Sequence, residues 1–235
     1  LSLVAGSESL FGQEYFNHSF FGVQFRLPSY GSFGLSVENF SVDYNGNSLS
    51  KETSIGLHQG ITLSSDRNST ISFGYGIKNY TVDYGSTAGV TGDGSDGIDL
   101  GSQSSLGIDI GLLASLADRI RFGAKAFNIN SPTLGDANSA VRLPQRAQVG
   151  IAFSPYDLVW TTAALTKSTG HASHFHGGMS YHILDNIFLR AGVMTNPNRF
   201  ATGFEVLVKK IRINYAFMTH PVLPLSHQIS VEVVR

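Results

Sequence analysis

Residues 106–112 read LGIDIGL and residues 120–126 read IRFGAKA, and these two stretches decide the class of fold. In both, apolar side chains occupy every second position, and glycine or a charged residue fills most positions between them. A period of two predicts a β-strand with one apolar and one polar face. The short segment at residues 116–118 then predicts a tight turn between two antiparallel strands.

The same alternation recurs from one end of the chain to the other. It predicts about fourteen strands, and only residues 112–120 resemble a helical turn. We expect the strands near residues 1–5, 15–27, 32–43, 52–63, 70–83, 104–115, 119–129, 145–154, 158–167, 173–183, 187–195, 200–208, 211–219 and 227–234. No linker separates them, which indicates one domain.

The predicted connections alternate between short and mostly longer ones. Residues 28–31 and 184–186 are short connections, whereas residues 85–103 and 130–144 are long. An outer-membrane barrel has this arrangement, with tight turns at the periplasmic end and long loops outside. A Greek-key sandwich has no reason to keep the alternation over fourteen strands. We therefore expect an all-β fold, a transmembrane up-and-down antiparallel β-barrel of about 14 strands.

The composition excludes several classes of function. Charged residues make up 14% of the chain and the net charge is -1, which gives no electrostatic support for nucleic-acid binding. Cysteine is absent, so disulfides, zinc-thiolate sites and thiol nucleophiles are excluded. No apolar run approaches the roughly 18 residues of a transmembrane helix, but a spanning strand needs only about 9–11.

The polar faces of the predicted strands carry small residues, such as Gly74, Gly107 and Gly123. Water-exposed faces of soluble sheets usually carry more Lys, Glu and Thr, whereas a crowded lumen favours small side chains. Aromatic residues near strand ends, including Tyr15 and Trp160, suit the interfacial girdles of a membrane barrel. Alternation alone does not separate the two cases, so a soluble all-β binding module remains an alternative.

Charged residues on the polar faces are candidate site residues. They would point into the lumen, where opposite charges can pair across strands and fill the space. The simpler interpretation is a structural role without passage of a solute. The candidates are Asp109, Arg121, Lys125, Arg190, Glu205, Arg212 and Glu232.

The densest histidine cluster is HASHFHGGMSYH at residues 171–182. His174, His176 and His182 share a strand face, and imidazoles so placed can ligate Zn, Cu or Ni. No carboxylate or fourth ligand lies at a recognised spacing, so they are weak metal candidates and we expect no metal. Polar lumen or loop histidines are the simpler interpretation.

Catalytic motifs are missing from the sequence. There is no GxSxG, and pairs such as Gly74 and Gly76 lie within a strand rather than between a strand and a helix. We therefore expect no catalytic residue, no cofactor and no enzyme. An outer-membrane lipid hydrolase would require a Ser–His pair within hydrogen-bond distance at the membrane boundary.

Beyond these patterns, a little over half of the chain resembles a known family. The segments that carry the resemblance are SSLGIDIGLLA (104–114), FNINSPTLG (127–135), PQRAQVGIAFSP (144–155), LRAGVMTNPNRFATGFEV (189–206) and INYAFMTHPVLPLSHQISVEV (213–233). They are similar to the PorV/PorQ-like outer-membrane barrels, which are associated with type IX secretion and belong to the wider FadL-like superfamily. The run at residues 220–230 is the most specific piece.

The resemblance implies a 14-stranded barrel in the outer membrane of a Gram-negative bacterium, in contact with lipid and lipopolysaccharide. It implies a binding or scaffold component that meets a protein partner in secretion or cell-surface assembly, through loops such as 85–104 and 129–144. A FadL-like conduit for hydrophobic small molecules is the alternative. The family's signal and plug segments are missing here, so we expect a single outer-membrane β-barrel domain over residues 1–235.

Overall fold

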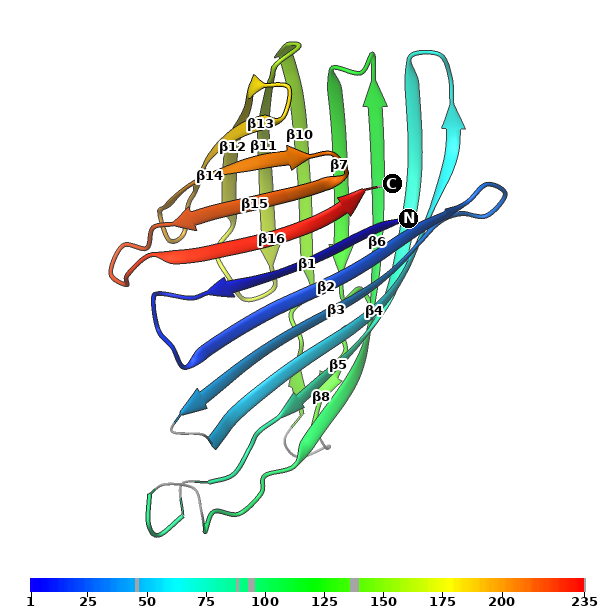
Figure 1. The fold of residues 1–235 in the computed structure, drawn as a ribbon. Coiled ribbons are helices and arrows are strands. Elements are labelled where there is room, and N and C mark those ends of the chain that lie inside the picture. The colour runs from blue at the N-terminus through cyan, green and yellow to red at the C-terminus, as the bar shows by residue number, and fades with distance from the viewer. Residues whose placement is uncertain (45–46, 88, 93–95, 136–139, 235) are drawn as a thin grey trace.

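Fourteen antiparallel strands close into one barrel (Figure 1). The computed structural model describes residues 1–235 except 45–46, 88, 93–95, 136–139 and 235. The strands of the barrel are β1 (Ser2–Ser9), β2 (Phe16–Leu27), β3 (Gly31–Tyr44), β4 (Asn47–Ser65), β5 (Ser69–Asp83), β6 (Ser102–Leu116), β7 (Ile120–Phe127), β10 (Arg146–Tyr156), β11 (Val159–Ser168), β12 (His174–Leu184), β13 (Ile187–Met194), β14 (Arg199–Val208), β15 (Ile211–Met218) and β16 (Ser226–Val234).

Each strand pairs with its neighbours in the chain, and the pairing of β1 with β16 closes the wall. The closing register runs from Ser2 opposite Val234 to Ser9 opposite His227. Closure removes the unpaired edges that an open sheet presents to other chains. The predicted all-β up-and-down barrel of about 14 strands is therefore confirmed.

One feature of the strand order was not predicted. Between β7 and β10 the chain forms a separate two-stranded sheet, β8 (Thr133–Leu134) with β9 (Val141–Arg142). This insertion is not part of the barrel wall, because β7 pairs directly with β10, with Phe127 opposite Arg146. Within the described residues, no helix is long and apolar enough to cross a membrane.

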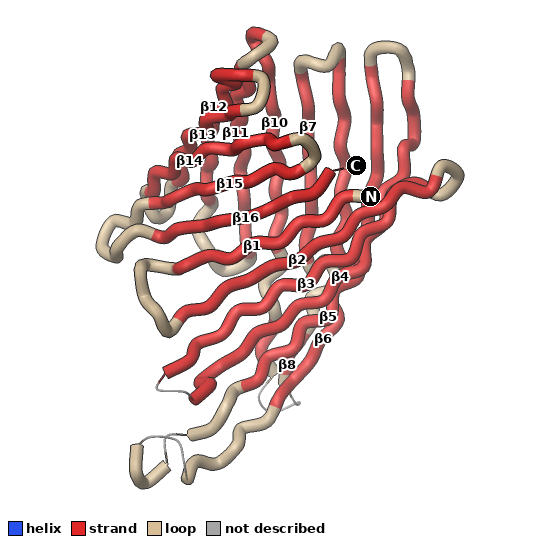
Figure 2. Tube along the Cα trace, viewed as in Figure 1, coloured by secondary structure: helices blue, strands red, loops and turns tan. Residues whose placement is uncertain are grey.

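The two ends of the barrel differ in the length of their connections. At one end β6 and β7 are joined by residues 117–119, and β14 and β15 by residues 209–210. At the other end residues 84–101 and residues 128–145 form the longest connections, and Figure 2 shows loops extending below the strands there. The alternation read from the sequence thus places all long loops at one end.

The two faces of the wall are reversed relative to a soluble protein. Leu57 points outward and is 65% exposed, whereas Asp109 and Glu205 face inward and are only 2% exposed. Of the residues that the structure describes, Leu134 is the one buried hydrophobic residue. A soluble barrel or sandwich would bury its apolar face, so the soluble all-β alternative is wrong.

The wall is taller on one side than on the other. Strands β3 to β6 contain 14, 19, 15 and 15 residues, whereas β13 to β16 contain 8, 10, 8 and 9. In Figure 2 the long strands extend toward the long loops. The side of the barrel formed by β3 to β6 therefore extends farther than the rest of the wall at the long-loop end.

The outward face of this tall side changes from apolar to polar along the strands. Leu35, Leu57, Ile77 and Ile108 form one row of cross-strand neighbours. Two rows nearer the long loops, the neighbours are Asn39, Thr53, Thr81 and Ser104. The Thr53 hydroxyl donates to Asn39 Oδ1 at 3.1 Å. Because outer faces are apolar only where lipid covers them, the polar row lies beyond the hydrocarbon.

Candidate functional site

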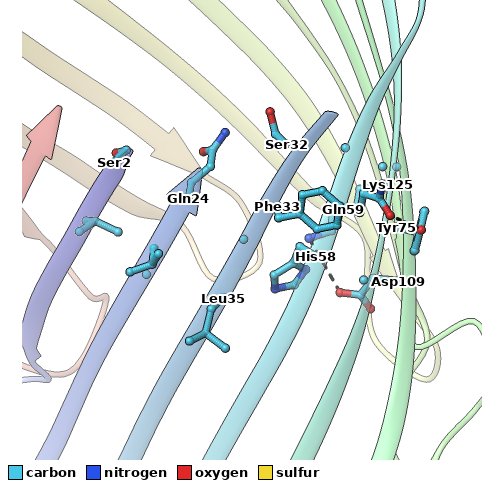
Figure 3. Close-up of a pocket in the computed structure, with 18 of the residues that line it drawn as sticks. Ser2, Gln24, Ser32, Phe33, Leu35, His58, Gln59, Tyr75, Asp109 and Lys125 are labelled. Atoms are coloured by element: carbon cyan, nitrogen blue, oxygen red, sulfur yellow. Dashed lines mark hydrogen bonds and ion pairs between the residues drawn. The ribbon is translucent and has the colours of Figure 1, made fainter. Parts of the chain in front are cut away.

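Glycines leave open space inside the barrel. A cavity of about 630 Å³ lies against β1 to β7 and β16, with Gly34, Gly60, Gly74 and Gly111 in its lining. Figure 3 shows His58 of β4, Asp109 of β6 and Lys125 of β7 around it. A further cavity of about 540 Å³ lies against β13 to β16, and one of about 590 Å³ lies against β4 to β7, β10 and β11. A side chain at these glycines would occupy the same space, which explains why small residues alternate with apolar ones.

A chain of ion pairs crosses the inner face of β13 to β16. Glu205 pairs with Arg190 on one side, and on the other its Oε1 lies 2.8 Å from Arg212 Nε. Arg212 Nη1 donates to Glu232 Oε2 at 2.8 Å, and the Ser2 hydroxyl donates to Glu232 Oε1 at 3.2 Å. The chain therefore connects five neighbouring strands across the closing seam between β16 and β1.

A second cluster surrounds the buried carboxylate of Asp109. Its Oδ1 accepts the backbone N–H of Asn128 at 3.0 Å. Its Oδ2 lies 3.8 Å from Lys78 Nζ and 3.9 Å from Lys125 Nζ, which are ion-pair rather than hydrogen-bond distances. A buried charge needs such partners, because desolvation of an unpaired carboxylate is strongly unfavourable.

Three cations gather around one aromatic ring beside this cluster. Arg146 lies 3.9 Å from the centroid of the Phe127 ring, Lys125 lies 4.1 Å from it and Lys78 lies 5.9 Å from it. Cations within about 6 Å of a ring centroid are attracted by its negative face. The ring stabilises a concentration of positive charge that Asp109 alone does not neutralise.

The predicted interior charges thus fall into separate groups. Asp109 and Lys125 lie together, whereas Arg121 stacks on Trp160 with its guanidinium carbon 4.4 Å from the ring. The remaining four, Arg190, Glu205, Arg212 and Glu232, form the ion-pair chain. Two further charges were not among the sequence candidates. The alternation places Lys78 on the polar face of its strand, and the same alternation from Val149 and Ile151 would have placed Arg146 there.

The three candidate histidines make separate contacts. His174 Nδ1 lies 3.2 Å from the carbonyl oxygen of Thr195, and His176 Nε2 lies 3.3 Å from the Thr166 hydroxyl. The His182 ring packs edge-on against Phe188, with centroids 4.1 Å apart. In the described part of the chain, no three His, Cys, Asp or Glu residues are grouped so that they could hold a metal ion.

One Ser–His pair does lie at hydrogen-bond distance. Ser36 Oγ is 2.9 Å from His58 Nε2, and both side chains belong to the interior face of β3 and β4. A hydrolase acting on membrane lipid requires such a pair at the lipid boundary. The location of this pair favours a packing role in the lumen instead.

The first long loop folds back on itself. The Thr87 amide donates to the Ile98 carbonyl at 3.0 Å, and the Ile98 amide donates to the Thr87 hydroxyl at 2.9 Å. Asp96 accepts the Thr91 hydroxyl at 2.7 Å and the Val90 amide at 3.1 Å. These bonds, the Thr91 hydroxyl first, hold the pKa of Asp96 below its ordinary value.

Large apolar side chains are exposed at the long-loop end. In the first loop Val90 is 97% exposed and Ile98 is 73% exposed. Val222 in the connection between β15 and β16 is 86% exposed, and Val141 of β9 is also exposed. Residues 88, 93–95 and 136–139 of the two predicted binding loops lie outside the described residues.

A closed wall with a lipid-facing apolar surface and a polar interior defines an outer-membrane β-barrel. Residues 12–232 match the family described as type IX secretion system membrane protein PorP/SprF. The chain belongs to this family. The predicted association with type IX secretion is thereby confirmed at the level of the family, whereas the PorV/PorQ part of the expectation is not specifically confirmed.

Similar solved structures agree on the fold. The toluene transporter TodX of Pseudomonas putida has 14% identity and a TM-score of 0.59, over 99% of this chain and 87% of that chain. A Pseudomonas aeruginosa FadL homologue has 12% identity and a TM-score of 0.56, over 98% and 88%. At such identities the likeness shows the fold alone. No curated protein matches this sequence.

Proposed function

We propose that this protein is a non-enzymatic binding or scaffold component of the outer membrane, in which the long-loop end holds a protein partner during secretion or cell-surface assembly. The observation that carries the proposal is that apolar side chains are exposed in loops that lie beyond the polar row of Asn39, Thr53, Thr81 and Ser104. Lipid does not cover that part of the protein. Membership of a type IX secretion family supports the class of partner.

The position of the exposed apolar residues supports a protein rather than lipid as their partner. Val90 and Ile98 follow β5, beyond Thr81 of the polar row, so they lie outside the hydrocarbon. Exposure of large apolar side chains to water is unfavourable, and covering them on a protein partner would remove that cost. Lipid, with lipopolysaccharide in the outer leaflet, is the partner that we propose for the apolar outer wall itself.

Substitutions in the first loop test the proposal. Val90→Ser, Ile98→Ser and Leu100→Ser together remove apolar contact area without touching the barrel wall. We expect at least a tenfold loss of type IX cargo at the surface or in the medium of the native host, with unchanged barrel content in the outer membrane.

The matched control removes similar apolar surface at the other end of the barrel. Tyr30 and Tyr156 lie at tight turns and are 68% and 73% exposed. Tyr30→Ser with Tyr156→Ser is expected to leave cargo secretion unchanged. Normal secretion by the triple loop variant, or an equal loss in the control, would contradict the proposal.

A second candidate function is a conduit for hydrophobic small molecules. The interior cavity of about 590 Å³, lined by Gly74, Gly123 and Gly150 among others, favours it. Adjacent strands are hydrogen-bonded around the described barrel, so the path would follow the barrel axis rather than a gap in the wall. Uptake of toluene by proteoliposomes above that of protein-free vesicles would support this function, and equal uptake would exclude it.

A further inference from the structure

A cavity of about 360 Å³ on the inner face of β10 to β14 has no part in the function proposed above. Its lining includes Arg146, Arg199, His174, His176, Thr166 and Ser168. We propose that this cavity binds an oxyanion, the carboxylate or phosphate group of a small hydrophilic solute. The proposal concerns the lumen and does not depend on the role of the loops.

The strand register brings these residues together. Arg146 lies opposite Ser168, and Thr166 lies opposite His174. On the next strands His176 lies opposite Met194, which in turn lies opposite Arg199. Strands β10, β11, β12 and β14 therefore contribute polar side chains to one patch of the interior, and β13 contributes Met194.

The patch is positively charged without acidic neighbours. Arg146 and Arg199 both line the cavity, and no aspartate or glutamate lines it. Among the described residues, neither guanidinium has a carboxylate within ion-pair distance. Two arginines without a counter-charge attract an anion, and hydrogen bonds from a guanidinium to an oxyanion are strong.

Arg199 also carries an unused donor. Its Nε is buried and has no hydrogen-bond partner among the described residues. Buried donors are normally paired, because removing an N–H from water without a new acceptor is unfavourable. An oxyanion in the cavity would supply that acceptor.

The Arg146 side chain is positioned by an aromatic ring on the neighbouring strand β7. Its guanidinium carbon lies 3.9 Å from the centroid of the Phe127 ring, and an arginine stacked on an aromatic face can still donate from its edge. Lys125 on the same ring adds positive potential. This stacking fixes the arginine before a ligand arrives, which lowers the entropic cost of binding.

The size and the remaining groups set the class of ligand. A volume of about 360 Å³ lies at the small end of ligand pockets, which span about 300–1,000 Å³. Thr166 and Ser168 offer hydroxyls to a hydrophilic solute. The same positive charge opposes a metal cation, so His174 and His176 belong to an anion site rather than a metal site.

Calorimetry on the detergent-solubilised barrel tests the site, with inorganic phosphate and acetate as separate probes at low ionic strength. We expect the wild-type protein to bind at least one probe. Tighter binding of phosphate would identify a phosphate ligand, and tighter binding of acetate would identify a carboxylate ligand. Arg199→Gln and Arg146→Gln should each weaken binding at least tenfold.

Arg121→Gln is the matched control, because it removes an equal charge from the Arg121 side chain that stacks on Trp160 outside this cavity. It should change the affinity less than twofold. Folding of each variant is verified in denaturing gel electrophoresis, where the unheated, folded barrel migrates faster than the heated, unfolded one. Should Arg199→Gln not fold, Arg199→Lys keeps the charge but loses the Nε donor, and binding must still weaken. Failure of the wild-type protein to bind both phosphate and acetate, or equal losses of affinity in all variants, would overturn the site.

Discussion

Glu205 is the residue on which the interior ion-pair chain depends most. It is 2% exposed and lies between Arg190 and Arg212, so its single negative charge is shared by two cations. Glu205→Gln leaves both guanidiniums without this charge. We expect the free energy of unfolding in detergent to fall by about 3 kcal/mol, as when one partner of a buried pair is removed.

Glu232→Gln is the control for this prediction. Glu232 lies at the end of the same ion-pair chain, and a quarter of its side chain is exposed, so water compensates for part of the loss. Its effect on the denaturant midpoint should be clearly smaller. A midpoint for Glu205→Gln equal to that of the wild type would show that the ion-pair chain contributes little to stability, and equal losses in the two variants would contradict the role given to burial.

Asp96 gives a prediction about pH in the first long loop. Its carboxylate accepts hydrogen bonds from Val90 and Thr91, so the folded loop favours the charged form and its pKa is lowered. The stabilisation is therefore present at neutral pH and is lost only as the pH falls through that lowered pKa. The amide NMR signals of Val90 and Thr91 should titrate with a midpoint below the ordinary value of 3.8. A midpoint at or above 3.8 would contradict the hydrogen bonds described.

At the scale of single residues, the sequence predicted on which face of a strand a side chain lies, but not which side chains it contacts. Alternation placed Asp109, Lys125 and Glu205 on the polar faces, and the structure puts Asp109 and Glu205 among its buried residues. It could not predict that Glu205 lies between two arginines or that Arg146 stacks on Phe127. Those contacts depend on the register between strands, which a single sequence does not contain.

The tight turn between β6 and β7 gives a prediction at the scale of an element. Ala117 and Asp118 are the two central residues of the turn that the Arg119 amide closes by donating to the Leu116 carbonyl at 3.1 Å, and they adopt positive φ angles of 50° and 54°, as in turns that match the twist of paired strands. A side chain at Ala117 is strained there, and glycine is not. Ala117→Gly should raise the free energy of unfolding by about 0.5–1 kcal/mol in urea titration.

Ala114→Gly, inside β6, is the comparison. Glycine in the middle of a strand gives the unfolded chain more freedom without relieving strain, so this variant should be less stable by about 0.5–1 kcal/mol. If both variants lost stability equally, the turn geometry would not be the cause.

Strand number and the alternation of loops were predictable at this scale, because both follow from a period of two and from the spacing of turns. The sheet of β8 and β9 was not, since two-residue strands have no detectable period. The change from an apolar residue at Leu57 to a polar one at Thr53, along the outward face of β4, was visible in the sequence. Only the register joined Thr53 to Asn39 and Thr81 in a polar row.

At the scale of the whole molecule, the residues that the structure describes form no interior apolar core that would hold the barrel together in water. Its stability depends on lipid or detergent around the outer face, on the closed hydrogen-bond ladder and on interior ion pairs. Removal of detergent should therefore cause aggregation, measured as loss of the monodisperse peak in size-exclusion chromatography. A monodisperse peak in plain buffer would be incompatible with a lipid-facing wall.

Labelling of single cysteines on intact cells tests the central claim most directly, because the chain contains no cysteine of its own. Ser104→Cys lies in the polar row, Leu57→Cys in the apolar row and Tyr30→Cys at a tight turn. With a membrane-impermeant maleimide, we predict labelling of Ser104→Cys, no labelling of Leu57→Cys, and labelling of Tyr30→Cys only after the outer membrane is permeabilised. Labelling of Leu57→Cys, or of Tyr30→Cys before permeabilisation, would contradict the lipid-facing wall or the outward direction of the long loops.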